Sequence, residues 1–186
     1  MEIFIGTLVT LAIYIIWVNN TIISRYNTVK ASWSDVLTQQ NEIIKVLPVL
    51  EKAISGHKEY EKEVMTKVTE LRTSAGGVQE GNINPSALND VQSKIGALQT
   101  AINIVQENYP DLNTHELVTG YMKAVEETQK QVSAALRLFN ANTMKYNETL
   151  QVFPNNIINN LISRKKKLSF YTDQQAEDNF TYKPDF

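Results

Sequence analysis

The sequence predicts an all-α fold, in which an N-terminal transmembrane helix is followed by an antiparallel bundle of three to four long helices. The first observation is a run from Ile3 to Val18 that has no charge and nothing more polar than Thr. The second is the spacing of apolar residues by alternating steps of four and three after Thr21, which places them on one helix face. We expect a transmembrane anchor at 1–23, a helical bundle at 24–162 and a basic and aromatic tail at 163–186.

The anchor is predicted from the length and composition of the apolar run. About 16 helical residues span roughly 24 Å, and the residues up to Ile23 lengthen the helix toward the ~30 Å of a hydrocarbon core. A cleaved signal peptide is the alternative, but no Lys or Arg precedes the run and no small-residue cleavage site follows it. Because Arg25 and Lys30 follow the run, the positive-inside rule puts the N-terminus outside and the body in the cytoplasm.

The first helix of the body carries an apolar stripe that Pro48 and Gly56 interrupt. The unbroken phase of the stripe favours a bend at this point. The polar residues His57 and Glu61 on the stripe, together with the basic tail, favour a break. A break gives four segments and returns the tail to the membrane, whereas a bend gives three and leaves it at the far end. We expect the break.

Capping residues mark the later helices. Asn84 can cap a helix whose first residue is Pro85, and Asn113 can cap a last helix that ends before Pro154. The stripe of the last helix has Phe153 as its final member.

Two polar residues stand where the stripes call for apolar ones. These are Gln40 in the first body helix and Asn142 in the last. Polar residues at such positions commonly fix the register of packed helices at a cost in stability. We interpret both in this way, and the sequence leaves open whether they meet.

Composition excludes several functions. The net charge of −2 argues against a nucleic-acid partner, and the absence of Cys excludes thiolate chemistry. His57 and Glu61 share a helix face, but two ligands do not make a metal site, and His115 is the only other His. We read this pair as a solvated helix face. The sequence therefore predicts no catalytic, cofactor-binding or metal-binding residue, and no cofactor.

The tail combines charge with aromatic residues. We expect lipid contact from its basic cluster, at about 1 kcal/mol per residue near an anionic surface; a solubilising helix end is the alternative. The aromatic residues belong either to an extended segment lying on the bundle, which we favour, or to a docking segment for a protein partner. The basic cluster is Arg164, Lys165, Lys166 and Lys167, and the aromatic residues are Phe170, Tyr171, Phe180, Tyr182 and Phe186.

Several short motifs, taken in order, resemble the LemA family of bacterial membrane proteins. They are a short anchor, RYN (25–27), ASW (31–33), VLPVL (46–50), NYPDL (108–112), YNETLQVFPNNII (146–158) and the ending KPDF (183–186). The resemblance covers nearly the whole chain and implies an antiparallel helical bundle on a membrane anchor, in a bacterial cell membrane. It implies no settled activity. Members are discussed beside membrane-bound metalloproteases, so such a protease is a partner by family association only. One departure is that Arg137 is the single Arg left where the family favours an Arg-rich run.

Two functional hypotheses follow. The first is a non-enzymatic, membrane-anchored helical scaffold that docks a protein partner or self-associates. The alternative is an enzyme or regulator whose site is assembled from dispersed polar residues of the bundle. An enzyme should show a concave site with convergent polar groups and perturbed carboxylates, and a scaffold a filled core with exposed apolar surface.

Overall fold

The computed structural model describes residues 1–54, 58–79, 81–108 and 116–172, and over these residues it contains helices and no strand. The predicted all-α class, with a long apolar N-terminal helix and a helical bundle, is therefore confirmed. The elements are α1 (Glu2–Ile54), α2 (Lys58–Gly76), α3 (Pro85–Asn108), α5 (Glu116–Gln151), α6 (Asn155–Ile158) and a π-helical turn, η1 (Asn159–Ser163).

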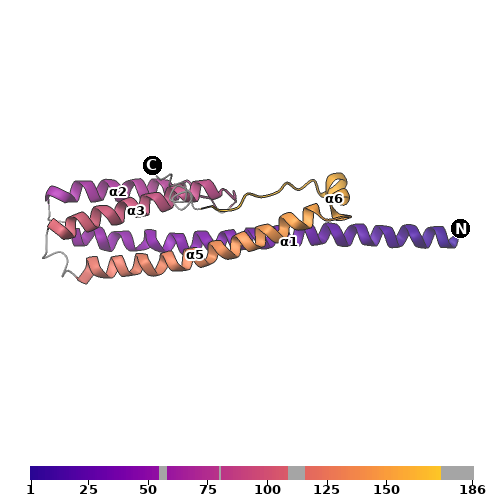
Figure 1. The fold of residues 1–186 in the computed structure, drawn as a ribbon, viewed down its shortest axis with the longest axis horizontal. Coiled ribbons are helices and arrows are strands. Elements are labelled where there is room, and N and C mark those ends of the chain that lie inside the picture. The colour runs from indigo at the N-terminus through magenta and orange to yellow at the C-terminus, as the bar shows by residue number, and fades with distance from the viewer. Residues whose placement is uncertain (55–57, 80, 109–115, 173–186) are drawn as a thin grey trace, which may run out of the picture.

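The long helices run alternately in opposite directions along the molecule. α1 runs away from the N-terminal end, α2 returns part of the way, α3 runs out again and α5 returns toward the N-terminal end (Figure 1). The expected break is confirmed, because α1 ends at Ile54 and α2 begins at Lys58. Pro48 is exposed inside α1, so the helix passes through it and ends further on.

α1 and α5 form the antiparallel spine of the rod. The Trp33 ring lies 5.3 Å from that of Phe139, and the Tyr26 ring lies 5.7 Å from that of Tyr146. Seven residues forward in α1 therefore correspond to seven residues back in α5, which is the register of two packed helices of equal pitch. Apolar stripe residues of both helices are buried along this seam, among them Val29, Val36 and Val132.

A second layer covers the spine, and its composition changes halfway along the rod. At the far end, α2 and α3 form a hairpin whose apolar residues pack on α1 and α5 around Leu47 and Val125. The hairpin stops near Trp33, whose indole N–H donates to the Gln79 carbonyl at 3.4 Å. From there toward the N-terminal end of the molecule, an extended segment takes the place of helices. We call residues 164–172 the strap (Figure 1).

The two polar seam residues do not meet. In the register of α1 and α5, Gln40 lies opposite Val132, about 15 Å along α5 from Asn142. Buried Gln40 instead accepts a hydrogen bond from the Gln92 side chain of α3 at 2.7 Å. Gln40 thus links the two layers.

Other local expectations have mixed outcomes. The Asn84 side chain accepts the backbone N–H of Ala87 at 3.3 Å, which confirms the predicted cap of α3. Asn113, the predicted cap of the last helix, lies outside the described residues. The expectation for Phe153 is wrong. It is 78% exposed, because α5 ends at Gln151 and the chain turns before Phe153 can join the seam.

Candidate functional site at the anchor end

Asparagine side chains of α5 hold the strap. Asn147 accepts the backbone N–H of Leu168 at 3.0 Å and donates to the Leu168 carbonyl at 2.9 Å. Asn140 makes the same pair of bonds with Tyr171, at 2.9 and 2.8 Å. Each primary amide therefore offers the extended backbone one acceptor and one donor, as a neighbouring strand would.

The spacing of these two asparagines matches the repeat of an extended chain. Asn140 and Asn147 are two helical turns apart, or about 10.5 Å along α5. Leu168 and Tyr171 are three extended residues apart, or about 10 Å. The strap consequently runs antiparallel to α5. The two asparagines bind its backbone groups, while the side chains of Leu168 and Tyr171 pack against the apolar cluster of the spine.

A third asparagine fixes the turn that leads into the strap. Buried Asn159 accepts the N–H of Lys165 and donates to the Lys165 carbonyl, both at 3.0 Å. Arg164, between the end of η1 and Lys165, has a φ of 48°, a left-handed conformation that costs a non-glycine residue about 1 kcal/mol. The two bonds of Asn159 offset this cost and direct the chain back along α5.

The same turn is bound to α1 at the end of the apolar run. The Ser163 hydroxyl donates to the Asn19 side-chain carbonyl at 2.7 Å, and the Lys165 ammonium lies 4.3 Å from the centre of the Tyr26 ring. Asn19 is the first polar residue after the apolar run. The strap therefore begins at the level where that run ends.

Tyr146 connects the spine to the strap. Its phenol donates to the Lys166 carbonyl at 2.9 Å. Burial, and then the nearby Tyr26, raise the pKa of Tyr146 to about 12. The phenol is thus protonated at neutral pH and keeps its role as a donor.

We expect Tyr146→Phe to lower the free energy of unfolding by about 1 kcal/mol at neutral pH, because the Lys166 carbonyl loses its donor. The folded-state pKa of Tyr146 is raised, so its contribution is complete below the unfolded pKa of about 10 and is lost as pH rises through about 12. Denaturant melts at pH 8 and across this alkaline range measure both effects. The variant should lose less stability over that range than the natural chain. An identical alkaline slope would contradict this.

The predicted tail residues have different environments. Arg164, Lys166 and Lys167 are exposed, whereas Lys165 is half-buried on Tyr26. Among the aromatic residues, Phe170 is exposed and Tyr171 is half-buried against the spine. Phe180, Tyr182 and Phe186 lie outside the described residues.

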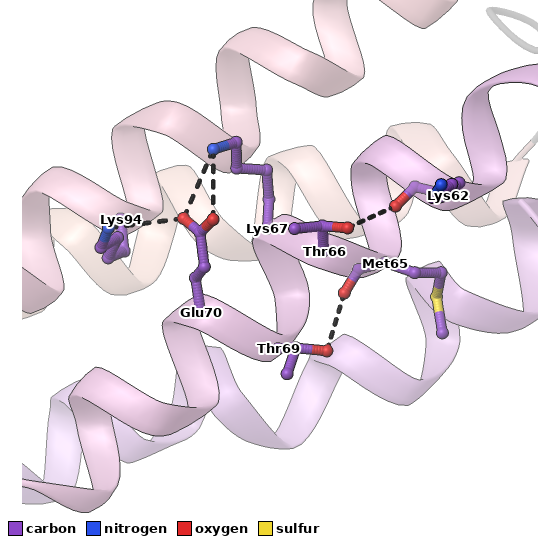
Figure 2. A network of polar contacts seen from close by, with 7 residues as sticks. All are labelled: Lys62, Met65, Thr66, Lys67, Thr69, Glu70 and Lys94. Atoms are coloured by element: carbon purple, nitrogen blue, oxygen red, sulfur yellow. Dashed lines mark hydrogen bonds and ion pairs between the residues drawn. The ribbon is translucent and has the colours of Figure 1, made fainter.

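A shallow groove of about 590 Å³ is lined by residues of α2 together with Lys94 of α3. One of these lining residues is Glu70, whose carboxylate binds Lys67 at 3.3 Å and Lys94 of α3 at 3.4 Å (Figure 2). These lysines lower the pKa of Glu70 through hydrogen bonds and charge. The hydroxyls of Thr66 and Thr69 donate to backbone carbonyls of their own helix. The groove is therefore an ion-paired surface that joins α2 to α3.

Nothing in the described part of the chain assembles a reactive centre. Within it, no group of three or more His, Asp or Glu side chains lies close enough together to hold a metal ion. Ser74 hydrogen-bonds Asp90 across the hairpin, without a histidine in the described residues to activate it. His57 and His115 and the side chain of Glu61 lie outside the described residues.

Sequence reasoning missed the asparagines that hold the strap. Asn140 and Asn147 are seven residues apart and flank an apolar stripe, and Asn159 follows the end of the last helix. Asparagine is unfavourable inside helices, because its amide competes for backbone hydrogen bonds. Two such residues at heptad spacing are the signal that could have revealed an extended segment of the same chain packed on this face.

Comparison with known proteins agrees with the architecture. A family model described as the LemA family matches residues 32–183. Protein LemA of Metamycoplasma hominis is 22% identical over 139 residues, which are 75% of this chain and 62% of that protein. The chain thus covers less than two thirds of the length of this relative. Because the family model extends over most of the sequence, from the first body helix into the tail, the chain belongs to the LemA family.

Proposed function

We propose that this protein is a non-enzymatic, membrane-anchored helical scaffold. The observation that carries the proposal is the return of the chain to the anchor, where Ser163 is hydrogen-bonded to Asn19. α1 is the one helix among the described residues that is long and apolar enough to cross a membrane, and its residues 2–14 are exposed. A single helix therefore continues from the anchor into the rod, and the strap secures the rod at its base.

The basic cluster supports a cytoplasmic body. Arg164, Lys166 and Lys167 are exposed on the same side of the apolar run as Arg25 and Lys30. Positive charge is enriched on the cytoplasmic side of single-pass proteins and is attracted to its anionic lipid. The protein would then sit in the bacterial cell membrane with its N-terminus outside.

Orientation can be tested because the natural chain has no cysteine. We expect Glu2→Cys to react with a membrane-impermeant maleimide on intact cells, and Asp35→Cys to react only after permeabilisation. Both positions are exposed, so the barrier to labelling is the membrane rather than the fold. The natural chain is the unlabelled control. Labelling of Asp35→Cys on intact cells would show that the orientation is the opposite one. Release of both variants from the membrane by a carbonate wash would contradict the anchor.

The scaffold hypothesis includes a protein partner or self-association, and no nucleic acid. Of the described aromatic tail residues, exposed Phe170 is suited to such a contact, since the Tyr171 backbone is already bound by Asn140. A membrane metalloprotease is a candidate partner through family association alone.

The groove on α2 and α3 gives the enzymatic alternative less support than the anchor end gives the scaffold. A general acid needs a carboxyl whose pKa is raised toward neutrality. The pKa of Glu70 is instead lowered by Lys67 and Lys94, so Glu70 is a stable anion that holds two helices together. A filled core together with exposed apolar side chains at the anchor end is the combination expected of a scaffold.

A further inference from the structure

The turn between α5 and the strap exposes a concentrated set of apolar side chains. We call residues 152–162, which include α6 and most of η1, the tip. Phe153 is 78% exposed and Leu161 is 70% exposed. The other exposed apolar members are Val152, Ile157 and Ile162. Such a concentration on a short turn indicates a surface that something apolar covers.

The position of the tip along α1 identifies what covers it. Buried Ile158 packs in the same cluster as Val18 and Ile22, with Ile15 beside them. Just after the tip, Ser163 donates a hydrogen bond to Asn19, which lies at the end of the apolar run. The tip therefore lies beside the last turns of the run, at the depth where a membrane-spanning helix meets the headgroups.

The tip is also continuous with apolar surface of the anchor itself. At the same depth, α1 exposes Ile13, Ile16 and Trp17, which face lipid if α1 spans the membrane. The exposed basic residues Arg164, Lys166 and Lys167 follow the tip immediately. Apolar residues flanked by clustered Lys and Arg are the pattern of segments that lie in the interface of an anionic membrane.

We propose that the tip is a second membrane attachment, embedded in the lipid interface beside the anchor. Phe153 and Leu161 enter the acyl boundary while the basic cluster meets the headgroups. Two adjacent attachments, one a spanning helix and one an interfacial turn, fix the orientation of the rod on the membrane. This inference rests on the proposed anchor, and the experiment must separate the two.

The test uses the full chain in vesicles of phosphatidylcholine and phosphatidylglycerol, with single cysteines carrying an environment-sensitive fluorophore. Phe153→Cys and Leu161→Cys report on the tip. Met144→Cys and Leu138→Cys are matched controls, because both are about half exposed apolar residues of α5 that lie further from the anchor. Leu8→Cys reports on the anchor. The fluorescence of each variant is measured with a lipid quencher that is spin-labelled near the headgroup end of its acyl chain, and separately with aqueous iodide.

We expect lipid quenching at positions 153, 161 and 8, and iodide quenching at 144 and 138. Quenching at position 8 with iodide access at 153 and 161 would overturn the embedded tip and leave the anchor intact. Iodide access at position 8 as well would overturn the anchor. Protection of 153 and 161 from both quenchers would mean that protein, such as a second copy, covers the tip, and would also overturn the proposal.

Discussion

Replacing Trp33 with Ala should lower the free energy of unfolding by about 3–5 kcal/mol, the range for removing a large aromatic side chain from a core. Trp33 is fully buried and stacks obliquely against Phe139, and its indole N–H reaches Gln79 at the end of the hairpin. It therefore stands where α1, α5 and the α2–α3 hairpin meet. Its loss opens a cavity at the junction of the two halves of the rod.

The measurement is denaturant unfolding of the full chain in lipid nanodiscs, followed by circular dichroism. Trp17→Ala is a matched control, because Trp17 is the only other tryptophan and is 62% exposed in the apolar run of α1. We expect the unfolding midpoint of the control to stay near that of the natural chain. Equal midpoints for both variants would show that the junction at Trp33 does not hold the rod together.

Much of the fold could be predicted because the spacing of apolar residues determines which helix faces pack together. The stripe through Val29, Trp33 and Val36 is buried as expected, and so is the stripe through Leu88, Val91 and Ile95. The same spacing could not decide whether the first helix breaks or bends. We expect the break because of the polar pair His57 and Glu61 and the charge of the tail, and α1 does end at Ile54.

Phe153 shows where spacing misleads. It continues the phase of the α5 stripe, but phase has no meaning once the helix ends at Gln151. An apolar residue in phase is buried in protein only if the helix continues; beyond the end it is exposed to whatever surrounds the molecule.

The strap could not be predicted for a different reason. Asparagine amides hold the extended segment through its backbone groups, which are the same in nearly every sequence. Residues 168–171 therefore carry no sequence pattern that predicts the contact. The information lies instead in Asn140 and Asn147, which a helical reading treats as solvated. The expectation of a segment lying on the bundle came from the aromatic residues alone, and the bonds that hold it came from elsewhere.

Replacing Asn147 with Leu should release the strap. Asn147 is 7% exposed and supplies both hydrogen-bonding partners of Leu168. Leu has a similar volume but leaves a backbone donor and acceptor unpaired, at a cost of about 2–4 kcal/mol if they stay buried. Detachment avoids part of that cost, so we expect local opening of the strap while the four long helices stay folded.

Trypsin measures this opening, because Arg164–Lys167 offers four cleavage sites that follow each other directly. A loss of about 2 kcal/mol in local stability raises cleavage within the cluster roughly 30-fold when opening is fast compared with cutting. Asn142→Leu is the control, since Asn142 is a half-buried asparagine of α5 with no hydrogen bond to the described strap residues. Cleavage at the rate of the control would mean that the amide pair does not retain the strap. A general fall in helix content would show instead that strap and spine unfold together, because Leu168 and Tyr171 pack with the residues around Tyr146 and their release would then open the core at the base of the rod.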